Sequence, residues 1–160
     1  MLIYTIGYGN RPIGDFLDLL RRYGVECLVD TRSLPYSRFR PDFRKKALQE
    51  HLEKNGFQYL YLGEALGGKR IDAECYVDGV LDMARLTARE DFRAAIGQVA
   101  AEAQAGRHLV LMCAELRPDQ CHRSWMLAPE MESRGFEVLH IDERGELKTQ
   151  AEVRGWFGNA

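Results

Sequence analysis

The chain has 160 residues, of which 46% are hydrophobic and 29% are charged, as expected for one soluble globular domain with one core. Its formal net charge of -2 excludes a strong overall attraction to nucleic acid or acidic membranes, but not a local basic patch. No apolar run approaches the roughly 20 residues that span a bilayer, and the N-terminus lacks the features of a signal peptide. We therefore expect a cytoplasmic protein without membrane association, whose 4 cysteines are reduced thiols.

The N-terminal half alternates between strand-like and helix-like patterns. An apolar strand is expected at residues 2–7, and the next apolar residues follow helical spacing over 13–23. A second strand at 26–32 runs into a polar loop. A second helix is expected at about 41–55, and a third strand at 57–63.

The C-terminal half continues the alternation after an irregular stretch at residues 64–82. A helix is expected after Thr87, and it leads into an apolar strand at 108–113. A further helix follows Cys121 and ends near Gly135, because glycine is favoured just past a helix end. The fifth strand is expected at 137–142.

This alternation predicts an α/β fold. We expect a single three-layer domain over residues 1–144, with a mainly parallel five-stranded sheet and helices on both faces. The crossovers between parallel strands should be right-handed. Residues 145–160 are expected to form a C-terminal tail that either packs on this domain or is partly disordered. No oligomeric state is predicted.

Polar residues gather where the predicted strands end. In open α/β sheets, ligands bind beyond the carboxyl ends of the strands. This rule selects the segments GYGN, DTRSLPYSRFR, GEALGGKR, CAELRPDQCHRS and HIDERGE. Because these segments hold most of the unusual polar residues, we expect the functional site at this edge.

The crossing from strand to helix at CAELRPDQCHRS is the leading candidate for chemistry. A helix start presents free N–H groups and a positive dipole end, which with Arg123 and Ser124 would hold an anion. The same surroundings would favour the thiolate form of Cys113 or Cys121. We predict an enzyme acting on an anionic sulfur- or phosphate-containing small molecule, with Cys113 as nucleophile and Cys121 as resolving or alternative thiol. A buried structural Cys113 is the alternative.

Further polar residues are candidates for supporting roles. Asp30 could act as a base or orient an arginine, and Arg32 could bind the anion, but a mutual salt bridge between them is equally compatible. Glu115, His122 or His140 would transfer protons.

Two other thiol functions remain open. Cys113 and Cys121 could form a reversible disulfide, as in a redox sensor. They could also bind zinc together with Glu115, His122 or His140, although adjacent ligands on one helix turn point about 100° apart. The leading hypothesis includes no metal and no resident cofactor.

The segment 32–46 suggests a different class of function. It carries five cations after Arg32, namely Arg38, Arg40, Arg44, Lys45 and Lys46, against Asp42 alone. Phe39 and Phe43 are interleaved with them. Such a pattern could bind a nucleic-acid backbone and stack bases, so a nucleic-acid or nucleotide binding module is the alternative function.

Several motifs together resemble the family known as domain of unknown function 488. YTIGYGN, LVDTRSLPYS, YLGEALGG, CAELRPDQCHR and VLHID occur in this order over roughly residues 2–142. The resemblance implies family motif positions at Thr5, Gly7, Asp30, Arg32, Pro35, Ser37, Gly67, Gly68, Cys113, Glu115, Cys121, His122 and Arg123. On this basis the expected substrate-binding residues are Thr5, Gly7, Arg32, Ser37, Gly67, Gly68, Arg123 and Ser124.

A weaker resemblance links the chain to rhodanese-like domains. LVDTR, LVLMC, the pair Arg123–Ser124 and SRGFEVLHI follow the order of the corresponding elements. The resemblance implies a nucleophilic Cys113 and an anion-binding Arg123. The chain departs from the short rhodanese loop, because nine residues separate these two positions and Pro118 contributes no N–H.

Overall fold

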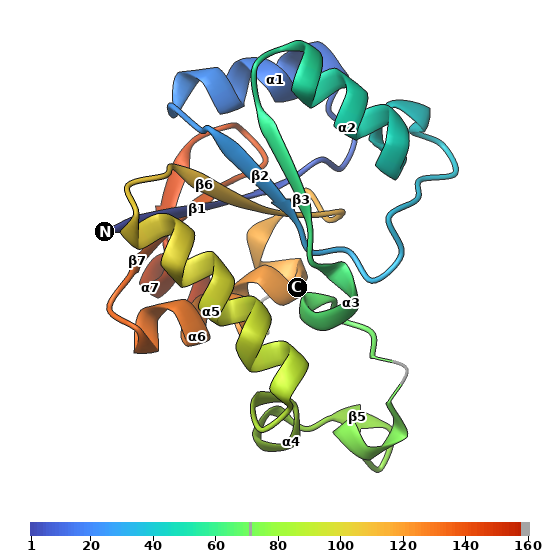
Figure 1. Cartoon of the computed structure of the whole chain (residues 1–160), viewed down its shortest axis with the longest axis vertical. Helices are drawn as coiled ribbons and strands as arrows, with labels where there is room; N and C mark the ends of the chain where they lie inside the picture. Colours follow the sequence, from blue (N-terminus) through green and yellow to red (C-terminus); the bar gives the residue numbers. More distant parts are fainter. Residues whose placement is uncertain (71, 158–160) are drawn as a thin grey trace.

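The computed structural model describes residues 1–70 and 72–157. Within them, a six-stranded sheet has the order β3-β2-β6-β1-β7-β8 (Figure 1). Its strands are β1 (Leu2–Gly7), β2 (Cys27–Asp30), β3 (Gln58–Tyr61), β6 (Leu109–Cys113), β7 (Glu137–Ile141) and β8 (Leu147–Thr149). The first five are parallel, and β8 is antiparallel to β7. The predicted α/β class and mainly parallel sheet are confirmed, with six strands instead of five.

The additional strand lies in the segment predicted as a tail. β8 has only 3 residues, too few for a recognisable alternation of apolar and polar positions. It is followed by the helix α7 (Gln150–Arg154), where the hydroxyl of Thr149 accepts a hydrogen bond from the backbone N–H of Glu152. Val153 of this helix is fully buried. Residues 158–160 of the predicted tail lie outside the described residues.

Two helices cover one face of the sheet. In α1 (Ile13–Arg22), Phe16, Leu17 and Leu20 are buried, at the spacing of one helix face. They belong to the same core as Leu48 and Leu52 of α2 (Lys45–Lys54). The predicted second helix is thus shorter at its start, because residues Pro41–Phe43 form a separate 3-10 turn.

The opposite face packs against α5 (Glu90–Gln104) and α6 (Ala128–Ser133). Strand β6 shows why both faces are covered. Leu109 and Leu111 belong to the core under α5, whereas Val110 and Met112 belong to the core under α1. Because successive strand side chains point to opposite faces, a fully apolar strand requires helices on both sides.

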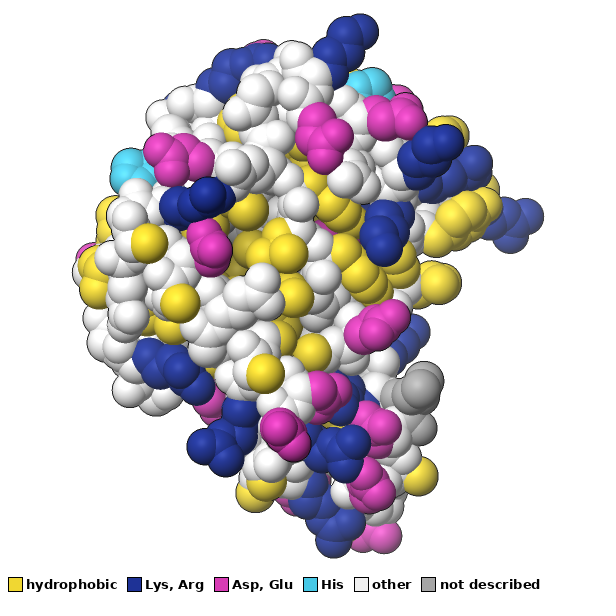
Figure 2. Space-filling model, viewed as in Figure 1, with side chains coloured by type: hydrophobic (Ala, Val, Ile, Leu, Met, Phe, Trp, Pro, Cys, Tyr) yellow, Lys and Arg dark blue, Asp and Glu magenta, His cyan; other side chains and the backbone are white. Residues whose placement is uncertain are grey.

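The stretch 64–82, predicted to be irregular, contains short elements. They are α3 (Gly63–Leu66), a 3-10 turn at Ala73–Cys75 and a hairpin of β4 (Tyr76–Val77) and β5 (Val80–Leu81). The helix α4 (Met83–Thr87) follows. Charged side chains of both signs crowd this end of the molecule in Figure 2, and Arg70 there pairs with Asp72 and Asp91. Residue 71 lies outside the described residues.

None of the helices within the described residues combines the length and apolar character needed to cross a membrane.

Candidate functional site

A pocket with a volume of about 320 Å³ opens at the carboxyl edge of the sheet. Its walls come from the segments that follow β2, α3 and β6. The lining residues are Arg32, Ser33, Leu34, Gly68, Lys69, Ala114, Glu115, Gln120, Cys121, His122 and Trp125. The pocket therefore occupies the position at which open α/β sheets bind ligands.

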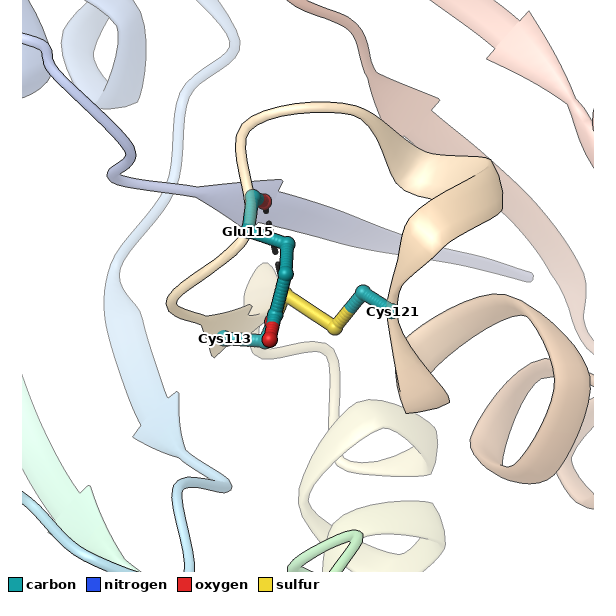
Figure 3. A group of neighbouring side chains, drawn as sticks. All are labelled: Cys113, Glu115 and Cys121. Atoms are coloured by element: carbon teal, nitrogen blue, oxygen red, sulfur yellow. Dashed lines mark hydrogen bonds between the residues drawn. A yellow bond between two sulfur atoms is a disulfide. The ribbon is translucent and has the colours of Figure 1, made fainter. Parts of the chain in front are cut away.

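A disulfide joins Cys113 and Cys121 at this pocket (Figure 3). Cys113 ends β6, and Cys121 follows a 3-10 turn at Pro118–Gln120, so that the two Cα atoms lie 7.0 Å apart. Both residues are almost completely buried, but Cys121 lines the pocket and Cys113 does not. The expectation of four reduced thiols is wrong for this pair, because the intervening loop folds back. Cys27 and Cys75 are free.

The loop between the two cysteines is fixed from two sides. Gly7 lies beside Cys113 in the sheet, and a Cβ atom at Gly7 would fall 1.6 Å from the carbonyl oxygen of Glu115. Only glycine allows this close approach. From the other side, Nη2 of Arg123 donates to the carbonyl oxygens of Leu116, at 3.0 Å, and Glu115, at 3.4 Å.

Arg123 is fully buried and does not line the pocket. Burial lowers the pKa of its guanidinium to about 9. Its Nε and Nη1 atoms have no hydrogen-bond partner among the described residues. The adjacent Ser124 is also buried, and its hydroxyl donates to the carbonyl oxygen of Cys121. Neither Arg123 nor Ser124 lines the pocket. Both stabilise the loop and turn that carry the cysteines.

His122 presents one ring nitrogen to Cys121. Its Nε2 lies 3.1 Å from the carbonyl oxygen of Thr31 and 3.2 Å from the Thr31 hydroxyl, which itself donates to the carbonyl of Met112. Both Thr31 atoms are therefore acceptors, so we assign the proton to Nε2. Nδ1, 3.5 Å from Sγ of Cys121, is then the unprotonated ring nitrogen. Burial lowers the pKa of His122, although the Thr31 carbonyl opposes the shift.

Asp30 and Arg32 form the mutual salt bridge. Nε and Nη2 of Arg32 donate to the two carboxylate oxygens of Asp30 at 2.9 and 2.8 Å, and Nη1 donates to the carbonyl of Phe43. The Tyr59 hydroxyl donates to the same carboxylate. Burial by itself lowers the pKa of Arg32, but the Asp30 bonds and charge raise it above its ordinary value. The pair therefore holds the pocket wall in place and leaves the Arg32 guanidinium committed to protein partners.

A second buried polar group lies away from the pocket. His140 accepts at Nδ1 from the Thr5 hydroxyl and donates from Nε2 to the Gln150 side chain, both at 2.6 Å. Gln150 in turn donates to the carbonyl oxygen of Ser124. Burial lowers the pKa of His140 to about 4. Thr5 and His140 thus connect the sheet to the turn after Cys121, and neither lines the pocket.

The glycine-rich segment has a steric role at the pocket. A Cβ atom at Gly67 would fall 2.0 Å from Oγ of Ser33, and one at Gly68 would fall 3.2 Å from the His122 ring. The hydroxyl of Ser33 accepts from the backbone N–H of Lys69. Ser37, predicted to bind substrate, instead accepts from the backbone N–H of Arg40.

Several pocket residues were missed by the sequence analysis. They are Ser33, Leu34, Lys69, Ala114, Gln120 and Trp125. Lys69 is the informative omission, since it is an exposed lysine among the lining residues. The sequence signal for Lys69 was its position directly after Gly67 and Gly68, in a segment already expected at the edge of the sheet.

Three side chains at the pocket have atoms that could bind a metal ion. The Sγ atoms of Cys113 and Cys121 and a carboxylate oxygen of Glu115 all lie within 4.8 Å of one another. Figure 3 shows the Glu115 side chain running beside the two sulfur atoms. Reduced thiolates and a carboxylate are suitable zinc ligands.

Comparison with known proteins identifies the family. No curated protein and no solved structure matches the chain. The likeness to rhodanese-like domains stays a prediction. Residues 12–128 match the family described as Domain of unknown function DUF488, within the range over which the motifs suggested it. This match covers more than half of the chain and includes Asp30, both paired cysteines and His122. The chain therefore belongs to the DUF488 family.

Proposed function

We propose that this protein is a thiol-dependent enzyme acting on a small, anionic, sulfur-containing molecule in the pocket. One observation carries the proposal: Cys113 and Cys121 are bonded to each other at the pocket, with Cys121 in its wall. A second thiol within bonding distance can resolve an intermediate attached through sulfur. Attack on phosphorus would not need this second thiol, and so the pair favours a sulfur substrate.

We propose the reverse of the roles first expected for the two cysteines, because Cys121 lines the pocket and Cys113 does not. The Cys121 thiolate attacks one sulfur of a substrate disulfide, and the other half leaves as a thiolate. The Cys113 thiolate then attacks Sγ of Cys121 and releases the bound half as a second thiolate. The substrate gains two electrons and the protein becomes the disulfide. Two external thiols then reduce the Cys113–Cys121 disulfide, become a disulfide themselves and complete the cycle.

The pocket supplies groups for both the thiol and the anion. Nδ1 of His122 can accept the proton of the Cys121 thiol, because Nε2 holds the ring proton against Thr31. Lys69 provides a positive charge at the pocket for an anionic substrate.

Trapping the intermediate tests this order of attack. Reduced Cys113→Ser protein, treated with oxidised glutathione in the presence of a chelator, should accumulate one mixed disulfide on Cys121, seen by peptide mass spectrometry. The wild-type protein should instead pass on to the internal disulfide. Cys27→Ser is the matched control and should behave as wild type. Adduct on Cys113 in Cys121→Ser, with none on Cys121 in Cys113→Ser, would contradict the assignment.

The anion contact has its own test. Lys69→Gln should slow formation of the mixed disulfide with oxidised glutathione by about tenfold, equivalent to about 1.4 kcal/mol. Reaction with an uncharged disulfide should be unaffected. Lys54→Gln, which removes a lysine from outside the pocket, is the control. Equal slowing with both substrates would count against a charge interaction.

A second candidate function rests on the loop between β2 and α2. Its side chains Leu34, Tyr36 and Phe39 are 72%, 50% and 82% exposed. The guanidinium of Arg44 lies 4.7 Å from the Tyr36 ring, and that of Arg38 lies 5.2 Å from the Phe39 ring. In Figure 2, apolar side chains flanked by Lys or Arg project at the edge where this loop lies in Figure 1.

The cations of this loop have no carboxylate partner in the part of the chain that the structure describes. Among the described residues, no ion pair involves the cations of segment 38–46, whereas Asp42 pairs with His51. Unpaired cations beside exposed aromatic rings are suited to phosphates and stacked bases. We therefore propose single-stranded nucleic acid as the ligand of this loop.

Salt dependence tests the second candidate. Binding of a labelled single-stranded oligonucleotide, measured by anisotropy, should weaken at least tenfold in Arg38→Glu/Lys46→Glu protein. The slope of log affinity against log salt should fall by about 1.4, because each lost phosphate contact contributes about 0.7. Lys54→Glu/Arg134→Glu is the matched control. Unchanged affinity and slope in the loop variant would refute the assignment.

A further inference from the structure

The paired cysteines lie within a larger set of potential metal ligands. Besides the two sulfurs and the Glu115 carboxylate, Nδ1 of His122 lies 3.5 Å from Sγ of Cys121. Atoms bound tetrahedrally to one zinc ion lie about 3.3–3.8 Å apart, as bonds of about 2.0–2.3 Å require. The two sulfurs and the Glu115 oxygen are thus near the mutual distances of zinc ligands, whereas Nδ1 of His122 meets this distance to Sγ of Cys121 and would complete the site from that side.

We infer that the reduced protein binds one zinc ion through Cys113, Cys121, Glu115 and His122. The disulfide and the metal are alternative states of the same two sulfurs. The disulfide is reduced to two thiols by two external thiols, which become a disulfide, or by a phosphine, which becomes a phosphine oxide with oxygen from water. Zn²⁺ then displaces two thiol protons and forms two zinc–sulfur bonds.

The orientation of His122 supports its role as a ligand. Its Nε2–H donates a hydrogen bond to Thr31. Nδ1 is therefore unprotonated, faces Cys121 and can bind a metal ion through its lone pair. A metal-bound histidine commonly has this arrangement, in which the second ring nitrogen donates to a carbonyl oxygen. The difficulty expected for adjacent ligands is removed here by the backbone. Cys121 is extended, with φ of -134°, and precedes the helical turn, so the two side chains do not share a helix surface.

The buried charge of Arg123 lies close to the paired cysteines. Its guanidinium and the Sγ atom of Cys113 both contact the carbonyl oxygen of Glu115. Its Nε and Nη1 lack hydrogen-bond partners among the described residues. Two thiolates, one carboxylate and Zn²⁺ together carry one negative charge, which is also the charge of the Glu115 carboxylate beside the disulfide. Asp119 and Glu143 act on the Arg123 charge as well, so the buried cation is compatible with both states of the two cysteines.

The metal would also have access to the pocket. Cys121, Glu115 and His122 all line the pocket, while Cys113 lies behind them. Oxidation by a disulfide substrate would therefore release the zinc ion. The inference concerns the reduced state and does not depend on the proposed enzyme activity.

Cobalt is the spectroscopic probe for this site. Full-length protein, reduced with a phosphine and desalted into metal-free buffer, is titrated with Co²⁺. We expect one cobalt per chain, a thiolate-to-cobalt band in the near ultraviolet, and its loss when one equivalent of Zn²⁺ is added. Cys113→Ser/Cys121→Ser protein and the oxidised wild type should lack the band. A reduced wild type without the band, or equal binding by the double variant, would overturn the inference.

Single substitutions test the two remaining ligands. Glu115→Gln and His122→Gln should each weaken zinc binding at least tenfold in competition with a chromophoric chelator. Glu50→Gln and Cys27→Ser should bind as wild type does. Unchanged affinity in either ligand variant would remove that residue from the site. The trapping of a mixed disulfide is measured with a chelator present and therefore does not depend on metal binding. The metal titrations contain no disulfide substrate. A negative result in one experiment therefore does not affect the other.

Discussion

The buried His140 makes the stability of the fold depend on pH. Burial lowers its pKa from 6.5 to about 4, so the folded protein favours the neutral ring. The ordinary value of 6.5 applies to the unfolded chain. A folded pKa below the unfolded pKa means that the contribution to stability is complete above about pH 6.5. It is lost as the pH falls from there toward 4.

The magnitude follows from the two pKa values. The full difference corresponds to about 3 kcal/mol, of which about 2 kcal/mol is lost at pH 5. Other groups add to acid destabilisation, so the test compares wild type with His140→Gln. For each protein, the free energy of unfolding is measured in urea by tryptophan fluorescence at pH 7.5 and at pH 5. The loss between these two pH values should be about 2 kcal/mol smaller in the variant than in the wild type. Any difference in stability between the two proteins at pH 7.5 cancels in this comparison.

Two results would refute this reasoning. Equal losses in the two proteins, within about 0.5 kcal/mol, would show that His140 does not contribute to the pH dependence. If the variant does not fold, NMR titration of the His140 ring in the wild-type protein replaces the comparison. A midpoint near 4 is expected, and a midpoint near 6.5 would contradict the burial argument.

Further predictions concern the walls of the pocket and the loop between the cysteines. Asp30→Asn should cost about 3–5 kcal/mol of unfolding free energy, because it leaves the buried Arg32 without its counter-charge; a loss below about 1 kcal/mol in urea would contradict this. Gly7→Ala should cost about 3 kcal/mol or more, since its Cβ would overlap the Glu115 carbonyl oxygen. Gly97→Ala, inside α5 with nothing within 4 Å, should instead stabilise by about 0.5–1 kcal/mol in thermal unfolding. Equal effects of the two glycine changes would show that the contact is unimportant.

The elements that the sequence predicts well are long and strongly patterned. The apolar strands at residues 2–7 and 108–113 and the apolar face of α1 were recognisable, because burial imposes a regular spacing on the chain. The small elements β8, α3 and the β4–β5 hairpin were not, since two to four residues are too few to show a period. These short pieces form through contacts with distant parts of the chain.

The functional site likewise has features that the sequence predicts and features that it does not. The residue types and the edge of the sheet that carries them follow from the sequence, because all parallel strands end at one edge. Which polar residues contact the pocket does not follow. Arg32 and Arg123 were both predicted as anion ligands. Arg32 lines the pocket with its guanidinium held by Asp30, whereas Arg123 does not line it and donates to loop carbonyl oxygens.

The sequence by itself determined that this chain is an α/β protein of the DUF488 family with two thiols and an imidazole at the carboxyl edge of its sheet. Only the tertiary structure decided that Cys113 and Cys121 meet, that Cys121 is the one in the pocket wall, and that Lys69 lines the same pocket. The physical reason is that spacing along the chain fixes which residues follow a strand. Side-chain direction at a loop depends on packing and hydrogen bonds to other segments, such as Gly7 against Glu115 and Thr31 against His122.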